Sequence, residues 1–243
     1  MNIRTLSEIS PKLKKDKKMN INNNGNELII NYEMSERIRK ITYNTSGECK
    51  VFDVSGEVIS QFKTICTIGY NQQYGTPISN DEKLLFIGSW ERGIFCYEIL
   101  TGKLSWKKGP GKVRRIIVSE DKLIIEMCDR GIYQRDAKSG ELLKEFKIPY
   151  CDNMYVLSDK EILVGPKRNQ YIILSTTDLS IIKQFHWSML NVNESLLFSI
   201  NTAKIENDYL LINGVEQYRN REETDEERYD FERVISLKRT NFG

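Results

Sequence analysis

The residue types that most often perform catalysis are few and scattered in this sequence. It has a single histidine, His186, and five cysteines that form no CxxC pair and no cluster with the spacing of zinc ligands. With one histidine, the sequence does not show which residues could act as the nucleophile, the base and the orienting residue of a catalytic triad. We therefore interpret His186 as structural and expect no bound cofactor and no metal. These observations favour a non-enzymatic protein and leave an enzyme as the alternative.

Two further patterns resemble chemical sites but have a simpler structural interpretation. The segment GPGK at 109–112 has the composition of a phosphate-binding loop, but neither GxGxxG nor a P-loop occurs. Aspartates recur near turn signals, where their carboxylates typically bond to nearby backbone N–H groups. Calcium binding is a weaker alternative because the spacing lacks the dense acids of a chelating loop. The recurring aspartates are Asp53, Asp81, Asp121, Asp129, Asp136 and Asp159.

The segment 215–233 has the composition of a protein-binding surface. It contains eight acidic residues and four arginines, with two tyrosines and a phenylalanine among them. Aromatic residues and arginine are enriched at protein interfaces, whereas charge alone indicates a solvated loop. The tyrosine-rich stretch 70–77, YNQQYGTP, is a second candidate. The predicted partner-binding residues are Tyr218, Arg219, Glu222, Glu223, Asp225, Glu226, Glu227, Tyr229, Phe231, Tyr70 and Tyr74.

The elements that must position these residues are short strands. Apolar runs rich in β-branched and aromatic residues alternate with Gly, Asn, Asp and Ser, and almost no stretch has helical periodicity. The runs recur: Gly93 corresponds to Gly131 and Gly102 to Gly140, each 38 residues apart. Self-similarity near 40 residues with about four strands per repeat predicts β-propeller blades. The fold class is therefore predicted to be all-β.

Glycines mark one turn in each of two repeats. In TGK (101–103) and SGE (139–141), glycine is expected to close a tight turn with positive φ, which a Cβ would oppose. The next repeat has TTDLS at 176–180, without glycine. We expect a wider or differently shaped turn there.

The repeats resemble those of PQQ-like, quinoprotein-type propellers, a pattern that is also WD40-like. The resemblance rests on Glu98-x-x-Thr101-Gly102-Lys103-Leu104-x-Trp106 and on Asp136-x-x-Ser139-Gly140-Glu141-Leu142 ending at Phe146. Asp53-Val-Ser-Gly56-Glu57 is a weaker third copy. The resemblance implies blade architecture and covers about residues 45–190. It does not imply a quinone, because the chain has no adjacent cysteine pair, no export signal and too few blades.

The repeats predict about five four-stranded blades. Because a propeller with an unpaired edge is prone to aggregation, we expect the strand 27–33, ELIINYE, to join the last blade and close the ring. Residues 1–26 read as a flexible basic and Asn-rich tail. Residues 27–243 then form a single propeller domain with a charged insertion at 215–233.

The bulk composition restricts the function further. Hydrophobic residues make up 40% of the 243 residues and the net charge is +2, without the basic excess of a dedicated nucleic-acid binder. No secretory signal or membrane-spanning run is evident, so we expect a cytoplasmic protein. The function predicted is a non-catalytic propeller that binds a macromolecule, most simply a protein. The alternatives are a bacterial immunity or antitoxin protein and a small hydrolase or lyase with a site in the propeller channel; the oligomeric state is open.

Overall fold

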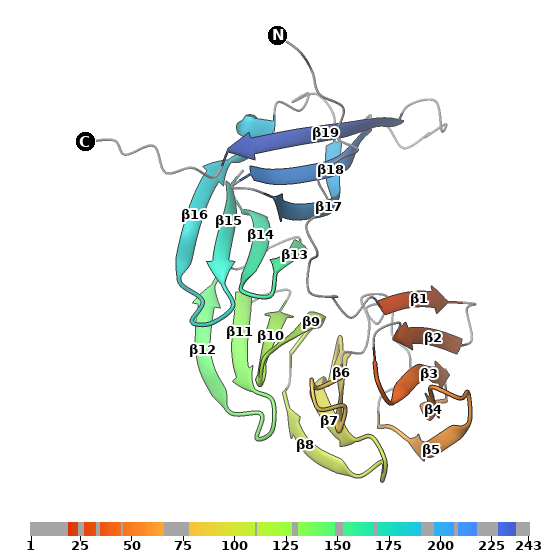
Figure 1. The fold of residues 1–243 in the computed structure, drawn as a ribbon. Coiled ribbons are helices and arrows are strands. Elements are labelled where there is room, and N and C mark those ends of the chain that lie inside the picture. Colours follow the sequence, from red (N-terminus) through yellow and green to blue (C-terminus); the bar gives the residue numbers. More distant parts are fainter. Residues whose placement is uncertain are drawn as a thin grey trace. The chain divides into compact units, whose positions relative to one another are not determined.

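In the residues that the computed structural model describes, the strands form antiparallel sheets, as the strand pattern predicts (Figure 1). The structure describes residues 19–23, 27–32, 35–44, 46–65, 78–109, 111–127, 131–148, 153–167, 170–190, 197–206, 209–217 and 228–236. These fall into two compact units. The first comprises Met1–Ile68 with Glu98–Lys103, and the second comprises Gly69–Tyr97 with Leu104–Gly243. The single domain predicted for 27–243 stays a prediction.

The first unit is built on one five-stranded sheet in the order β1-β2-β3-β4-β5. Its buried side chains include Ile30, Ile41, Tyr43, Cys49 and Val51, which come from β2, β3 and β4. The strands are β1 (Met19–Asn23), β2 (Glu27–Tyr32), β3 (Ile38–Asn44), β4 (Glu48–Asp53) and β5 (Val58–Lys63). The stretch predicted as a tail thus includes a strand, β1.

The predicted closure of the ring by strand 27–33 was wrong. The predicted closing strand corresponds to β2, which pairs with β1 on one edge and with β3 on the other. Both edges of β2 are therefore occupied by neighbours in sequence, because short connections make local antiparallel pairing the easiest to form. Among the described residues, the last sheet contains β17, β18 and β19 and no N-terminal strand.

The second unit contains four sheets, each formed by consecutive strands (Figure 1). Within the described residues, two of these sheets have the predicted four strands and two have three. The first sheet has β6 (Leu84–Ser89), β7 (Gly93–Glu98) and β8 (Leu104–Lys108). The second has β9 (Val113–Ser119), β10 (Lys122–Met127), β11 (Gly131–Asp136) and β12 (Leu142–Lys147). The third has β13 (Asn153–Ser158), β14 (Glu161–Lys167), β15 (Gln170–Ser175) and β16 (Ile181–His186), which the 3-10 turn η2 (Trp187–Leu190) follows. The fourth has β17 (Leu197–Glu206), β18 (Tyr209–Gln217) and β19 (Arg228–Ser236).

Three hydrophobic cores lie between successive sheets of the second unit. In β10, Leu123 and Ile125 belong to the core shared with the β6–β8 sheet, whereas Ile124 belongs to the core shared with the β13–β16 sheet. In β15, Ile172 and Ile173 likewise face opposite cores. Side chains alternate across a strand, so a sheet covered on both faces needs consecutive apolar residues. This explains why the middle strands read as continuous apolar runs.

The turns between the third and fourth strands secure one sheet to the next. Gly140 has φ of +70°, and a Cβ there would lie 2.7 Å from the Trp106 ring of the preceding sheet. The Trp106 indole Nε1 also donates a hydrogen bond to the backbone oxygen of Ala137 at 3.1 Å. Glycine is thus required both by the turn and by the aromatic side chain above it. Trp106, the aromatic residue that ends its repeat, therefore packs on the turn of the next repeat.

The turn without glycine keeps the same shape, which corrects the prediction of a different turn. Leu179 has φ of +55°, and its N–H donates to Ser175 O at 2.9 Å. The equivalent bond from Gly140 N to Asp136 O is also 2.9 Å. Leu179 is 2% exposed and packs in the same core as Phe146. Burial of this side chain offsets the strain of a left-handed conformation, about 1–2 kcal/mol.

Candidate protein-binding surface

In its described part, the last sheet departs from the repeat in strand number and in strand length. Its strands contain ten, nine and nine residues, whereas the strands of the two preceding sheets contain six or seven. The pairing of β18 with β19 is continuous from Tyr209↔Ser236 to Gln217↔Arg228. Residues 215–217 and 228–233 of the predicted insertion therefore belong to a long hairpin (Figure 1).

One face of this sheet is buried and the other is exposed. Leu210, Ile212 and Ile235 are at most 4% exposed and pack in the core shared with the β13–β16 sheet. On the opposite face, Tyr209 is 40% exposed and Val234 is 60% exposed. Large apolar side chains left in water on one sheet face are typical of an interaction site when they lie together with polar groups.

Acidic side chains accompany these apolar residues. Asp230 and Glu232 of β19 are exposed and alternate with the strand period, in line with Val234. Their cross-strand neighbours on β18 are Val215 and Asn213, neither of which is a cation. We call Tyr209, Asp230, Glu232 and Val234 the outer face of the last sheet. This face combines apolar contact area with negative charge.

A nearby lysine does not neutralise this charge. The Lys204 ammonium lies 2.7 Å from Glu206 Oε1, and both residues belong to β17. Surface ion pairs of this kind contribute about 0–1 kcal/mol to stability, so this pair is a weak structural feature. Its cation is nevertheless matched by an anion on its own strand. Among the described residues, Asp230 and Glu232 have no ion pair.

Only two of the sequence-predicted partner-binding residues lie within the described strands. Tyr229 and Phe231 are in β19, where their backbones pair with Glu216 and Gly214. The remaining candidates, Tyr70, Tyr74, Tyr218, Arg219, Glu222, Glu223, Asp225, Glu226 and Glu227, lie outside the described residues. The partner-binding role of the set therefore stays a prediction.

Sequence reasoning missed Tyr209 and Val234 because both lie in strands that read as core. Tyr209 begins the apolar run YLLIN, and Val234 is followed directly by Ile235. The signal that distinguishes them is alternation, since Leu210 and Ile212 are buried while Tyr209 and Asn213 are exposed. Alternation predicts one buried face.

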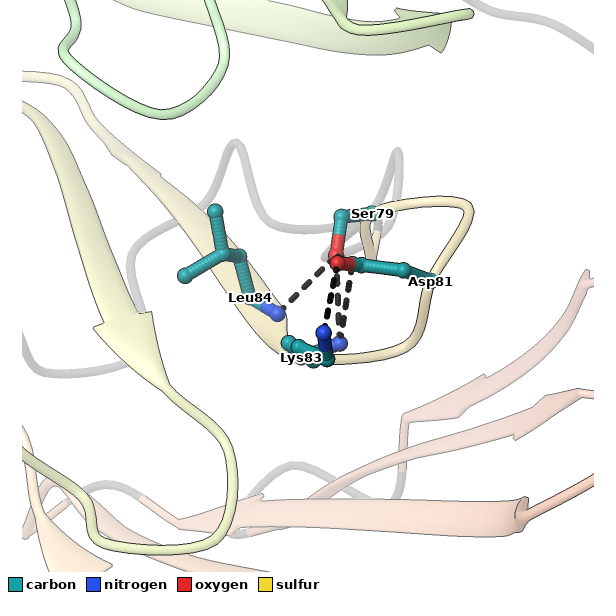
Figure 2. Close-up of polar contacts among 4 residues, drawn as sticks. All are labelled: Ser79, Asp81, Lys83 and Leu84. Carbon is teal, nitrogen blue, oxygen red and sulfur yellow. Dashed lines mark hydrogen bonds and ion pairs between the residues drawn. The ribbon is translucent and has the colours of Figure 1, made fainter.

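Those recurring aspartates whose hydrogen bonds the structure shows bond within their own turns, as predicted. Asp53 Oδ1 accepts from the Ser55 hydroxyl at 2.6 Å, and Asp136 Oδ1 accepts from the Ser139 N–H at 2.7 Å. These bonds favour the charged carboxylate and lower the pKa of both aspartates. In the turn before β6, the Ser79 hydroxyl donates to Asp81 Oδ1 at 2.6 Å and accepts from the Leu84 N–H at 3.0 Å (Figure 2). Local turn geometry accounts for these shifts in pKa.

Other polar side chains that could take part in chemistry also make structural contacts. Arg115 of β9 donates to Met154 O, and its guanidinium lies 5.8 Å from the centre of the Tyr155 ring. The Tyr155 hydroxyl donates to Ile200 O at 2.8 Å. These contacts join the first strands of three successive sheets. Within the described ranges, no three His, Cys, Asp or Glu residues are grouped so that they would hold a metal ion.

Comparisons with known proteins give the fold. No protein-family model matches the sequence, and no curated protein matches it. BamB from Moraxella catarrhalis, a PQQ-like β-propeller repeat protein, superposes with a TM-score of 0.56 at 13% identity over 82% of this chain. The sheets are blades of the β-propeller type. The computationally designed Ika8 protein is also similar, with a TM-score of 0.55 at 10% identity over 79% of this chain.

The chain spans 64% of the length of the BamB chain and 66% of the Ika8 chain. At these identities the likeness extends to the fold alone. Within the described residues, no helix has the length and apolar character needed to cross a membrane. The last blade, with β17, β18 and β19, is the one whose outer face carries the candidate surface.

Proposed function

We propose that the chain is a non-catalytic β-propeller scaffold that binds a protein partner through blade-face loops and the acidic segment 215–233. A propeller-type fold fits a scaffold that binds partners. The observation that carries the proposal is the outer face of the last sheet, where Tyr209 and Val234 are exposed beside Asp230 and Glu232. The middle strands of the two preceding blades have both faces buried, whereas their outer strands β12 and β16 are also largely exposed.

The charge of the segment defines the partner's surface. Segment 215–233 has eight acidic residues and four arginines, which gives a net charge of 4 − 8 = −4. A complementary partner presents lysine or arginine around an apolar centre, because opposite charges accelerate encounter and exclude wrong partners. The affinity should fall as salt is raised, since exposed charges are screened within about 10 Å at 0.1 M ionic strength.

The test is affinity capture from the native host lysate, followed by binding with the purified partner. The full chain is compared with D230K/E232K and with a control, E57K/E141K, which reverses two exposed acids in turns of other blades. A stoichiometric protein that binds the full chain and the control but not D230K/E232K supports the proposal. A partner that binds all three equally contradicts the assigned surface.

A narrower form of the proposal makes the partner a bacterial toxin with a basic active site. The chain would then act as an immunity protein whose acidic hairpin covers that site. Co-expression with neighbouring toxin genes tests this form. Protection that D230K/E232K abolishes supports it, and failure to protect against any of them contradicts it.

The competing class is a small hydrolase or lyase acting in the propeller channel. It requires carboxylates and arginines that converge on one site with perturbed pKa values. The lowered pKa values of Asp53, Asp81 and Asp136 have a different cause, because each carboxylate bonds within its own turn. This distribution favours the scaffold.

We also place the scaffold in the cytoplasm. Cys49 and Cys96 are buried thiols and not a disulfide. Thiols of this kind are typical of reducing compartments. Fractionation of host cells tests the placement, and recovery of the protein outside the cytoplasmic fraction would contradict it.

A further inference from the structure

One strand of the second unit, β11, carries a charge where the corresponding strands carry buried side chains. Its Arg135 occupies the position of Tyr97 in β7 and of Leu174 in β15, which are 2% and 0% exposed. The three positions are equivalent because the residue that follows each of them donates its backbone N–H across the next turn. A partly buried arginine at such a position is costly unless another group compensates its charge.

The protein compensates the charge of Arg135 only in part. The Arg135 guanidinium donates to Gly140 O at 2.8 Å and lies 5.8 Å from the centre of the Tyr133 ring. Within the described part of the chain, no carboxylate forms an ion pair with it. Burial lowers the pKa of Arg135, because it disfavours the charged form. A guanidinium has five N–H donors, so most of them remain for a further acceptor.

A second cation, Lys108, lies against the same turn. Lys108 and Trp106 are two residues apart in β8 and therefore share a face of that strand. A Cβ at Gly140 would lie 3.1 Å from the Lys108 Cε and 2.7 Å from the Trp106 ring. The glycine thus leaves room for both side chains. Like Arg135, Lys108 has no ion pair with the described residues.

The two cations come from adjacent sheets and lie beside one core. Trp106 of β8 and Tyr133 of β11 both pack against the hydrophobic core between the β6–β8 and β9–β12 sheets. Lys108 shares the face of Trp106, and Arg135 shares the face of Tyr133, since residues two apart in a strand point the same way. All four side chains are partly exposed. We call Arg135, Lys108 and the turn at Gly140 the basic site.

We propose that the basic site binds the phosphate group of a small molecule, either free phosphate or a phosphate monoester, through Arg135 and Lys108. A guanidinium can donate two parallel N–H groups to phosphate oxygens, and lysine adds a point charge. A phosphate monoester carries a charge of about −1.5 to −2 at pH 7, which suits two cations better than a single carboxylate does. The basic site shares no residue with the outer face of the last sheet, so it is independent of the proposed scaffold function.

Replacing Arg135 by leucine separates ligand binding from a structural role. Leucine is the residue that β15 has at this position, so R135L should fold with an apolar side chain in place of a partly desolvated charge. We expect the urea midpoint of ligand-free R135L to equal or exceed that of the original chain, because well-packed apolar residues often replace buried charges without loss. A binding residue that lowers stability is a common compromise in proteins.

Isothermal titration calorimetry of the full chain at low ionic strength tests the proposal. The probes are inorganic phosphate, phenyl phosphate and acetate, which distinguish free phosphate, an organic phosphate and a single carboxylate. The variants are R135L and K108Q. The matched control is K160Q, which removes an exposed lysine from the turn between β13 and β14. Because Lys108 is partly exposed, K108Q tests the site even if R135L does not fold.

We expect phosphate to bind more tightly than acetate, and R135L and K108Q each to weaken phosphate binding about tenfold, since each removes a charged hydrogen bond. K160Q should bind phosphate as the original chain does. Tighter binding of phenyl phosphate than of inorganic phosphate assigns the site to an organic phosphate, and equal or weaker binding assigns it to free phosphate. No phosphate binding, or binding that R135L and K108Q leave unchanged, overturns the proposal. An equal loss in K160Q also overturns it.

Discussion

The Trp106 indole Nε1 donates a hydrogen bond to Ala137 O at 3.1 Å, across the boundary between two blades. The equivalent position in the next blade is Phe146, which has no donor. There the Gln134 side chain, 3% exposed, donates instead to Thr176 O at 2.6 Å. Thr176 and Ala137 occupy the same position in their turns. Different side chains thus donate to the backbone carbonyl at the same position of successive turns. This explains how the repeats differ in sequence while the packing between blades is kept.

Two substitutions of Trp106 should reduce the stability of this blade boundary to different degrees. W106F keeps a ring over Gly140 but loses the hydrogen bond, so we expect the free energy of unfolding to fall by about 1 kcal/mol. W106A also loses the packed ring and should cost about 3–5 kcal/mol. Urea denaturation followed by circular dichroism measures both. W90F serves as the control, and W106F as stable as the original chain would contradict the role of the bond.

Gln134 should be hard to replace by an apolar residue of similar size. Q134L fills the same space but leaves the buried Thr176 O without this donor, at a cost of about 1–3 kcal/mol. The W106F/Q134L double variant should lose about the sum of the two single effects, because the two bonds lie at different blade boundaries. Urea unfolding of all three variants checks this, and an unchanged midpoint for Q134L would show that the bond contributes nothing.

The left-handed residue Leu179 should tolerate glycine poorly despite its positive φ. L179G relieves about 1–2 kcal/mol of backbone strain but removes a buried leucine side chain, which costs about 2–5 kcal/mol. We therefore expect a net loss of about 1–3 kcal/mol. Thermal and urea unfolding measure it. A gain in stability would mean that strain outweighs the packing of Leu179 against Phe146.

Stability should decrease in acid through the turn aspartates. The Ser180 hydroxyl holds the pKa of Asp178 at about 2, below the value of about 4 of an unfolded chain. A carboxyl with a lowered native pKa adds stability above the unfolded pKa, and this stability is lost as pH falls from about 4 towards 2. D178A should therefore reduce stability at pH 7 and flatten its pH dependence below pH 4. An unchanged slope in acid would contradict this.

The unfolding of each unit can be followed through one buried thiol in that unit. Burial raises the pKa of the Cys49 thiol to about 12, so it is protonated and protected in the folded chain. Cys96 is buried in the second unit. We expect pulses of iodoacetamide during urea unfolding, read by mass spectrometry, to label each thiol only after its own unit opens. Rapid labelling of Cys49 in native buffer would contradict its burial.

The sequence predicts the blades well because their spacing is a local property. Asn80 bonds to Glu120 O and Ser119 to Asp159 O, each 40 residues along the chain, in agreement with the repeat. The turn at Leu179 was mispredicted because glycine is the usual but not the only residue that adopts positive φ. A strong core contact can hold leucine there.

The end of the chain was harder to predict because charge obscures its pattern. In RYDFERVIS, acidic residues at alternate positions resemble a solvated loop, yet Arg228–Ser236 pairs with β18 over its whole length. Strand pairing with β18 is a tertiary effect that overrides local propensity. The partner of strand 27–32 was also mispredicted, because sequence pattern alone gives no pairing partner. Tyr209 and Val234 became candidates only when the buried face of the sheet was known.

Hydrogen–deuterium exchange along β19, measured for the chain alone and with its captured partner, tests the central claim most directly. Backbone amides that a bound partner covers exchange more slowly. We predict that peptides covering 228–236 gain protection in the complex and that those covering 142–147, the outer strand of another blade, do not. Unchanged exchange at 228–236, with protection elsewhere, would contradict binding at the last blade.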